Sequence, residues 1–163
     1  MDIQNFLNIT PFNWSAILTA LACGTIIGIE RQIRGKPAGI RTSSLIILGT
    51  YVFMACSIYV SKDAKMSDPS RIIGQVITGI GFLGAGVMLS KGRSVYGVTS
   101  AATIWSLAAI GVCIGISELG SAFKLSLVVV VVLFGVDIFE DYSQRMGRRM
   151  QSRYSDWRNR DDE

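Results

Sequence analysis

The sequence contains no histidine and few charges: Asp, Glu, Lys and Arg make up 17% of its 163 residues. Soluble domains carry about 25% charged residues, so this deficit indicates a lipid environment. Without histidine, a nucleophile–base pair or a pair of neighbouring acids, the sequence offers no arrangement that could do acid–base or covalent chemistry. We therefore expect a protein that is not an enzyme.

Cysteine is also scarce, and Cys23, Cys56 and Cys113 lie singly in separate apolar stretches. Three dispersed thiols do not form a disulfide framework, and no C-x-x-C pair or histidine accompanies them as metal ligands. We predict no metal site and no cofactor, with the cysteines packing as small hydrophobic side chains. No Lys or Arg precedes Arg31, so a signal peptide with a basic start is not expected and the first apolar segment should be retained.

Long hydrophobic runs are plentiful, and charges are absent from residues 3–29, 42–61, 72–90 and 94–117. A helix that crosses a hydrocarbon core of about 30 Å needs roughly 20 apolar residues, so each run can hold one span. A shorter uncharged run at 125–136 is a fifth candidate. The expected fold is all-α: a polytopic membrane protein, in which residues 1–142 form a bundle of about five transmembrane helices near 14–30, 42–61, 71–90, 98–117 and 121–142.

Lys and Arg are divided unevenly between the two sides that five spans define. Twelve lie in the segments 31–41, 91–93 and 143–163, against four on the opposite side. Cytoplasmic loops are enriched in Lys and Arg, so the N-terminus is expected outside and the C-terminus in the cytoplasm. Asn13, just after Pro11, is a suitable N-cap for the first helix.

The segment 143–163 is rich in arginine, and in helical register Met146, Met150, Tyr154 and Trp157 share one face. This pattern predicts a basic amphipathic tail that lies on the cytoplasmic headgroups and contacts anionic lipid. The alternative is a solvated tail that only fixes the topology. The basic surface is too small to indicate a nucleic-acid partner.

Small residues are concentrated in the third expected span, which contains Gly74, Gly79, Gly81, Gly84 and Gly86. Small faces let membrane helices approach closely, so we expect this helix to be central and to contact at least two neighbours or a second subunit. The first and fourth spans add two further G-x-x-x-G pairs, Gly24 with Gly28 and Gly111 with Gly115.

The glycine-rich span also has an alternative interpretation, a broken helix whose bare backbone lines a binding site, as in transporters. Gln75 would then be a polar group of that site, although a lone Gln more often hydrogen-bonds between helices. A phosphate-binding loop is disfavoured because Lys91 does not follow in a Gly-Lys-Ser/Thr pattern.

Polar residues gather where the expected helices reach the cytoplasm. Arginines can pair with carboxylates or phosphates in bidentate fashion. In the first cytoplasmic loop, glycines and a proline surround the arginines, which favours a structured loop over one that only supplies positive charge. A hydroxyl-rich turn opening the fourth helix could accept an anionic group or simply cap that helix, and Thr42 could cap the second. The predicted functional cluster comprises Glu30, Arg31, Arg34, Arg41, Thr42, Thr99 and Asp137.

Three blocks within about residues 14–117 resemble the MgtC/SapB family of bacterial membrane proteins. The first block reads Gly24-x3-Gly28-x-Glu30-Arg31-Gln32-x-Arg34-Gly35-x2-Ala38-Gly39-x-Arg41-Thr42. The second reads Arg71-x3-Gln75-x3-Gly79-x-Gly81-Phe82-Leu83-Gly84-Ala85-Gly86. The third reads Gly97-x-Thr99-Ser100-Ala101-Ala102-Thr103-x-Trp105, with Ala109, Gly111 and Gly115 following. Ser100 stands where a second Thr is commoner in the family.

The resemblance implies a multi-pass protein of the bacterial inner membrane. It also implies a link to magnesium homeostasis under limitation, to acid stress and to virulence. By the same resemblance, the protein would bind and restrain the membrane part of ATP synthase and would not itself carry magnesium. Many relatives continue into a cytoplasmic regulatory domain, and only about twenty residues follow Tyr142 here. We therefore expect a short form without that domain, whose function cannot be transferred.

Two functions follow as hypotheses. The first is a non-enzymatic membrane regulator that acts through helix–helix contacts, either as a homodimer or homo-oligomer or with another membrane protein. The second is a small oligomeric transporter or channel linked to magnesium or protons, which five spans could form only as an oligomer.

Overall fold

A computed structural model describes residues 8–61, 68, 70–91 and 94–135. The chain forms two compact units, Met1–Val130 and Val131–Glu163. Of the second unit only residues 131–135 are described, and they are the last residues of the helix Leu119–Gly135. Asp137 and the predicted amphipathic tail lie outside the described residues.

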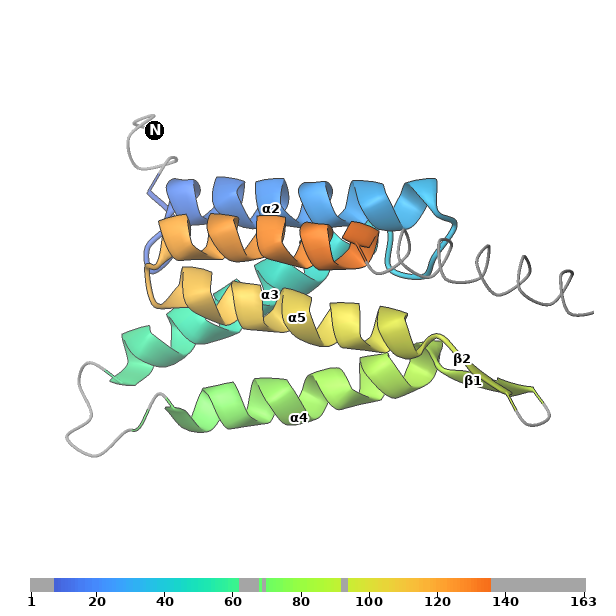
Figure 1. The fold of residues 1–163 in the computed structure, drawn as a ribbon. Coiled ribbons are helices and arrows are strands. Elements are labelled where there is room, and N and C mark those ends of the chain that lie inside the picture. Colours follow the sequence, from blue (N-terminus) through green and yellow to red (C-terminus); the bar gives the residue numbers. More distant parts are fainter. Residues whose placement is uncertain (1–7, 62–67, 69, 92–93, 136–163) are drawn as a thin grey trace, which may run out of the picture. The chain divides into compact units, whose positions relative to one another are not determined.

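Helices dominate the described chain: α2 Trp14–Ile33, α3 Ile40–Ser61, α4 Ser70–Val87, α5 Val98–Gly115 and the helix Leu119–Gly135 (Figure 1). The first four are each long and apolar enough to cross a membrane. The predicted all-α membrane fold is therefore confirmed. The orientation, with the N-terminus outside, stays a prediction.

The start of α2 has the cap that the sequence predicts. The Asn13 side chain accepts a hydrogen bond from the Ser15 backbone N–H at 3.0 Å, satisfying a donor that the first helical turn leaves unpaired. The Asn13 backbone N–H in turn donates to the Tyr51 hydroxyl at 2.8 Å. This bond joins the beginning of α2 to the middle of α3.

Two boundaries differ from the expected ones. Thr42 does not cap the second helix, because α3 already begins at Ile40 and Thr42 lies exposed in its first turn. Instead the Ser43 hydroxyl donates to the Ala38 carbonyl oxygen at 2.8 Å. The third helix ends at Val87 rather than near residue 90, because the chain turns into an antiparallel hairpin of β1 Leu89–Lys91 and β2 Ser94–Tyr96.

Helix α3 lies between α2 and α5 and forms the centre of the first unit. A Cβ added at Gly24 or Gly28 of α2 would collide with the backbone of Ser44 or Ile40 on α3. On the other side, a Cβ at Gly111 of α5 would lie 2.7 Å from the Ile47 carbonyl oxygen. The glycines of α2 and α5 therefore bring both helices into backbone contact with α3, which is how small residues work in membrane bundles.

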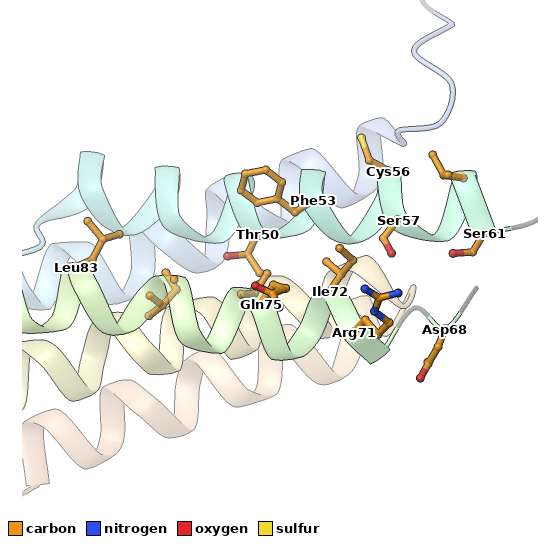
Figure 2. A pocket seen from close by; sticks show the side chains of 14 residues that line it. Thr50, Phe53, Cys56, Ser57, Ser61, Asp68, Arg71, Ile72, Gln75 and Leu83 are labelled. Atoms are coloured by element: carbon orange, nitrogen blue, oxygen red, sulfur yellow. The ribbon is translucent and has the colours of Figure 1, made fainter. Parts of the chain in front are cut away.

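Helix α4 is peripheral within the chain, contrary to the expectation that it would be central. It lies beside α5 (Figure 1), and only Gly84 is buried, with its added Cβ 3.6 Å from the Ala101 Cβ. Toward α3 it leaves an open groove of about 750 Å³ (Figure 2). The expected central position was wrong because glycine content indicates only that a close approach is possible, whereas tertiary packing decides which surface approaches. The expected contact with two neighbours, α5 and α3, is present, and a contact with a second subunit stays a prediction.

Candidate functional site

A buried ionic cluster lies at the C-terminal end of α2. Glu30 and Arg31 are each only 2% exposed. Arg31 continues the face of α2 on which Ala20, Gly24 and Ile27 are buried, because residues three and four apart share one side of a helix. The helix thus carries a guanidinium into the bundle where its hydrophobic face would otherwise continue.

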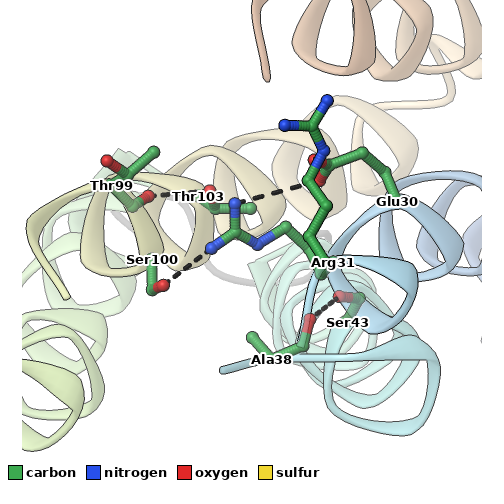
Figure 3. Close-up of polar contacts among 8 residues, drawn as sticks. Glu30, Arg31, Ala38, Ser43, Thr99, Ser100 and Thr103 are labelled. Atoms are coloured by element: carbon green, nitrogen blue, oxygen red, sulfur yellow. Dashed lines mark hydrogen bonds and ion pairs between the residues drawn. The ribbon is translucent and has the colours of Figure 1, made fainter. Parts of the chain in front are cut away.

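The cluster is held by two ion pairs and one hydrogen bond, and Figure 3 shows the contacts of Arg31 with Glu30 and Ser100. Arg34 Nε lies 2.8 Å from Glu30 Oε1, one helical turn away, and Arg31 Nη1 lies 3.8 Å from Glu30 Oε2. Arg31 Nη2 donates a hydrogen bond to Ser100 Oγ on α5 at 2.7 Å. Through Arg31 the cluster therefore links the end of α2 to the first turn of α5.

Several buried polar atoms in this cluster lack hydrogen bonds. The Glu30 oxygens are ion-paired, but neither accepts a geometrically sound hydrogen bond from the described chain, and Arg31 Nε has no hydrogen-bond acceptor there. Native proteins leave few such groups, and a buried charge pair without supporting hydrogen bonds contributes little net stability. Ionisable residues inside membrane bundles are costly and are usually functional. These properties single out Glu30 and Arg31 as candidates.

The loop that follows the cluster is ordered by its own backbone. The Lys36 N–H donates to the Arg31 carbonyl at 2.9 Å, and the Gly35 N–H donates to the Gln32 carbonyl at 3.1 Å. Gly35 adopts a φ of +60°, a left-handed conformation that glycine accepts without strain. The predicted structured loop is confirmed, and it turns the chain back into α3 within a few residues.

The hydroxyl-rich start of α5 contributes a different residue from the one predicted. Ser100 is buried and accepts the bond from Arg31, whereas Thr99 is exposed and its carbonyl accepts a bond from the Thr103 hydroxyl at 2.8 Å. Sequence reasoning missed Ser100 as a member of the cluster. The signal available was only that a hydroxyl turn and an arginine-rich loop fall at the same end of the bundle.

Two of the other predicted members do not join the cluster, and the third is not tested. Arg41 and Thr42 are exposed in the first turn of α3, and Asp137 lies outside the described residues. The cluster that the structure assembles is thus Glu30, Arg31, Arg34 and Ser100. Within the described ranges, no three residues among His, Cys, Asp and Glu come close enough to hold a metal ion.

The glycines of α4 meet almost nothing in the part of the chain that the structure describes. A Cβ added at Gly74, Gly79, Gly81 or Gly86 finds no described heavy atom within 4 Å. The helix itself runs without interruption from Ser70 to Val87, so the alternative of a broken binding helix is wrong for this structure. Gln75 is exposed and lines the groove toward α3.

Comparison with known proteins agrees with the family resemblance of the three sequence blocks. The profile of the MgtC family matches residues 17–142. "Putative magnesium transporter YhiD" of Escherichia coli strain K12 is 47% identical over 125 residues, which cover 72% of this chain and 58% of that protein. "Protein MgtC" of Salmonella typhimurium strain LT2 is 41% identical over 113 residues, covering 69% and 47%.

A more distant relative shows the same partial coverage. "Protein MgtC" of Brucella abortus strain 2308 is 37% identical over 126 residues, which cover 73% of this chain and 52% of that protein. The chain spans about half the length of the curated relatives it matches. No solved structure matches it.

Proposed function

The chain belongs to the MgtC family, and from this premise we propose that it is a non-enzymatic regulator in the bacterial inner membrane. It acts through helix–helix contact with another membrane protein or with a second copy of itself. The family resemblance connects this action to magnesium limitation, acid stress or virulence, and makes the membrane part of ATP synthase the first partner to examine.

The observation that carries the proposal is an unpartnered stripe of small residues on α4. Gly74, Thr78, Gly81 and Ala85 recur at four- and three-residue intervals, which places them on one side of the helix, and all four are exposed. Close approach of a second backbone is the main use of such a face between membrane helices.

On α2 and α5, by contrast, the small-residue faces already pack against α3 of the same chain. Gly24 and Gly28 receive the backbone of α3, and Gly111 and Gly115 receive Thr50 and Met54. A glycine in a helix interior costs about 1 kcal/mol relative to alanine, so the open glycines of α4 lower its stability and no packing contact from the described chain compensates. Contact with a partner helix would compensate for this loss.

Gly81→Leu tests the proposal. The larger side chain projects into open space within this chain, so folding should be preserved, but it would hold a partner backbone away. We expect copurification of the wild-type partner from native membranes to fall at least tenfold, because losing 1.4 kcal/mol of contact is a factor of ten in binding. The measurement is quantitative mass spectrometry of proteins retained on the tagged chain.

Gly49→Leu on α3 is the matched control, because a Cβ at Gly49 also meets nothing within 4 Å. It should leave the retained proteins unchanged. If Gly81→Leu and Gly49→Leu gave the same retained proteins as the wild type, regulation through the α4 stripe would be excluded.

A second candidate function, transport of magnesium or protons by an oligomer, is favoured by one observation: the buried and incompletely hydrogen-bonded Glu30. Carboxylates at such positions serve in proton and ion pathways. Mg²⁺, however, demands near-octahedral oxygen coordination, and Glu30 is a single carboxylate held between two arginines. A cationic neighbourhood repels the cation that would have to pass.

Flux measurements separate the two functions. Under the regulatory proposal, proteoliposomes containing the chain should admit Mg²⁺ and protons no faster than protein-free vesicles, as followed with entrapped magnesium-sensitive and pH-sensitive dyes. Flux that exceeds this background and disappears in Glu30→Gln would establish transport instead. Arg41→Gln, at an exposed position, serves as the control for a general change in charge.

A further inference from the structure

The groove between α3 and α4 has a polar mouth and an apolar interior (Figure 2). Arg71, Ser57 and Ser61 lie near the ends of the two helices, where α3 stops and α4 begins. Farther along the helices the lining is mainly apolar, with Phe53, Ile80 and Leu83, although Thr50 and Gln75 also line it (Figure 2). Its volume of about 750 Å³ falls within the range of small-ligand pockets, roughly 300–1,000 Å³.

The length of the groove fits one leaflet of a bilayer. Its lining on α4 runs from Arg71 to Leu83, and twelve residues at 1.5 Å each span about 18 Å. A leaflet contributes half of a hydrocarbon core of about 30 Å. A transmembrane helix of a second copy would need a groove over the full thickness, whereas a lipid of one leaflet needs a polar end at the surface and an apolar end near the midplane.

Among the described residues that line the mouth, Arg71 is the one cation and Asp68 the one anion. Asp68 accepts hydrogen bonds from the Ser70 hydroxyl at 2.7 Å and from its backbone N–H at 2.9 Å. These bonds, with a smaller effect from the nearby Arg71 charge, hold the pKa of the Asp68 carboxyl below its ordinary value, so it is ionised at neutral pH. Arg71 is exposed and makes no ion pair of 4.0 Å or less with any described residue.

From the shape, length and charges together, we infer that this groove binds a glycerophospholipid with a zwitterionic phosphate–ammonium headgroup, with one acyl chain along Ile80 and Leu83. The phosphate pairs with the Arg71 guanidinium, a charge-assisted contact that arginine makes well. The ammonium extends beyond it toward Asp68. A lipid with a net negative headgroup would gain the first contact and be repelled at the second.

Apart from Arg71, which lies three residues before Gly74, the lipid groove and the partner stripe occupy different sides of α4. At about 100° of rotation per residue, Gly79 and Leu83 point nearly opposite to Gly81 and Ala85. The groove therefore does not compete with the regulatory contact proposed above, and either proposal can fail alone.

The test uses phosphatidylethanolamine that carries a diazirine in its acyl chain, incorporated with the full-length chain into nanodiscs. After illumination, peptide mass spectrometry should find the label concentrated on groove-lining residues of α3 and α4. Gly79→Leu places a side chain in the groove without meeting any atom within 4 Å at its Cβ and should reduce this labelling at least tenfold. Arg71→Gln should reduce it about tenfold, the size expected for one hydrogen bond to a charged group.

Two controls accompany these variants. Gly81→Leu, on the far side of α4, and Arg41→Gln, an exposed arginine on α3, should both label like the wild type. Because Arg71 is exposed, its variant should fold even if Gly79→Leu does not.

Three results would overturn the inference. The first is groove labelling that survives both Gly79→Leu and Arg71→Gln. The second is stronger labelling by the phosphatidylglycerol analogue than by phosphatidylethanolamine, which would assign the mouth to an anionic headgroup. The third is conversion of a dimer to monomers by Gly79→Leu, measured by native mass spectrometry, which would make the occupant a second copy of the chain.

Discussion

Gly28→Leu is expected to destabilise the folded protein by more than about 3 kcal/mol, at the upper end of what overpacking costs. A Cβ at Gly28 would collide with the backbone of Ile40, including its nitrogen at 2.7 Å. Backbone atoms at the start of a helix cannot rotate away as a side chain can. Leucine would therefore have to separate α2 from α3 and open the contact at the centre of the first unit.

Equilibrium unfolding in mild detergent, followed by circular dichroism, measures this effect. Gly28→Ala should show part of the loss, because the first added carbon already collides. Gly49→Leu is the matched control and should not lower the free energy of unfolding, since its Cβ meets no described atom within 4 Å and leucine is a better helix former than glycine. Equal stability of Gly28→Leu and Gly49→Leu would show that α2 and α3 do not cross at Gly28.

Glu30→Gln is the second variant with a large expected effect. Removing the charge takes away the ion pair of the Arg31 guanidinium, which is only 2% exposed, and leaves it with the hydrogen bond to Ser100. Breaking a buried pair by removing one member costs about 3–5 kcal/mol. We expect a loss of this size in the free energy of unfolding, measured in the same detergent system.

The double variant Glu30→Gln with Arg31→Met distinguishes a charge effect from a general loss of packing. With both charges removed, no uncompensated ion remains from this pair, so stability should recover by about 1–3 kcal/mol relative to Glu30→Gln. Arg41→Gln, at an exposed site, should stay within about 0.5 kcal/mol of the wild type. A double variant less stable than the sum of its single variants would contradict a stabilising contact between Glu30 and Arg31.

Much of the helical framework was predictable because it follows from local composition. Uncharged runs of spanning length place four helices correctly in type and approximately in extent. The Asn13 cap was predictable for the same reason, since a capping side chain acts on an N–H only two or three residues away. The end of α4 was misplaced because the hairpin that follows depends on cross-strand pairing of Leu89 with Tyr96 rather than on hydropathy.

The ionic cluster was predictable in part. Glu30 and Arg34 are one helical turn apart, so their contact follows from the sequence once the helix is assumed. Arg31 was identified as a candidate, and its burial could have been anticipated from the spacing of Gly24 and Ile27 on the same face. Ser100 could not, because it lies on another helix 69 residues away along the chain.

The sequence by itself determined that this is a helical membrane protein of the MgtC family, because hydropathy, caps and motif blocks are properties of neighbouring residues. Only the tertiary structure decided how its glycines are used. Glycine permits a close approach without specifying which surface approaches, so the glycines form packed contacts in α2 and α5 but mostly open faces in α4. It also decided that Arg31 meets Ser100 and that a groove separates α3 from α4, since both depend on how helices distant in the chain cross.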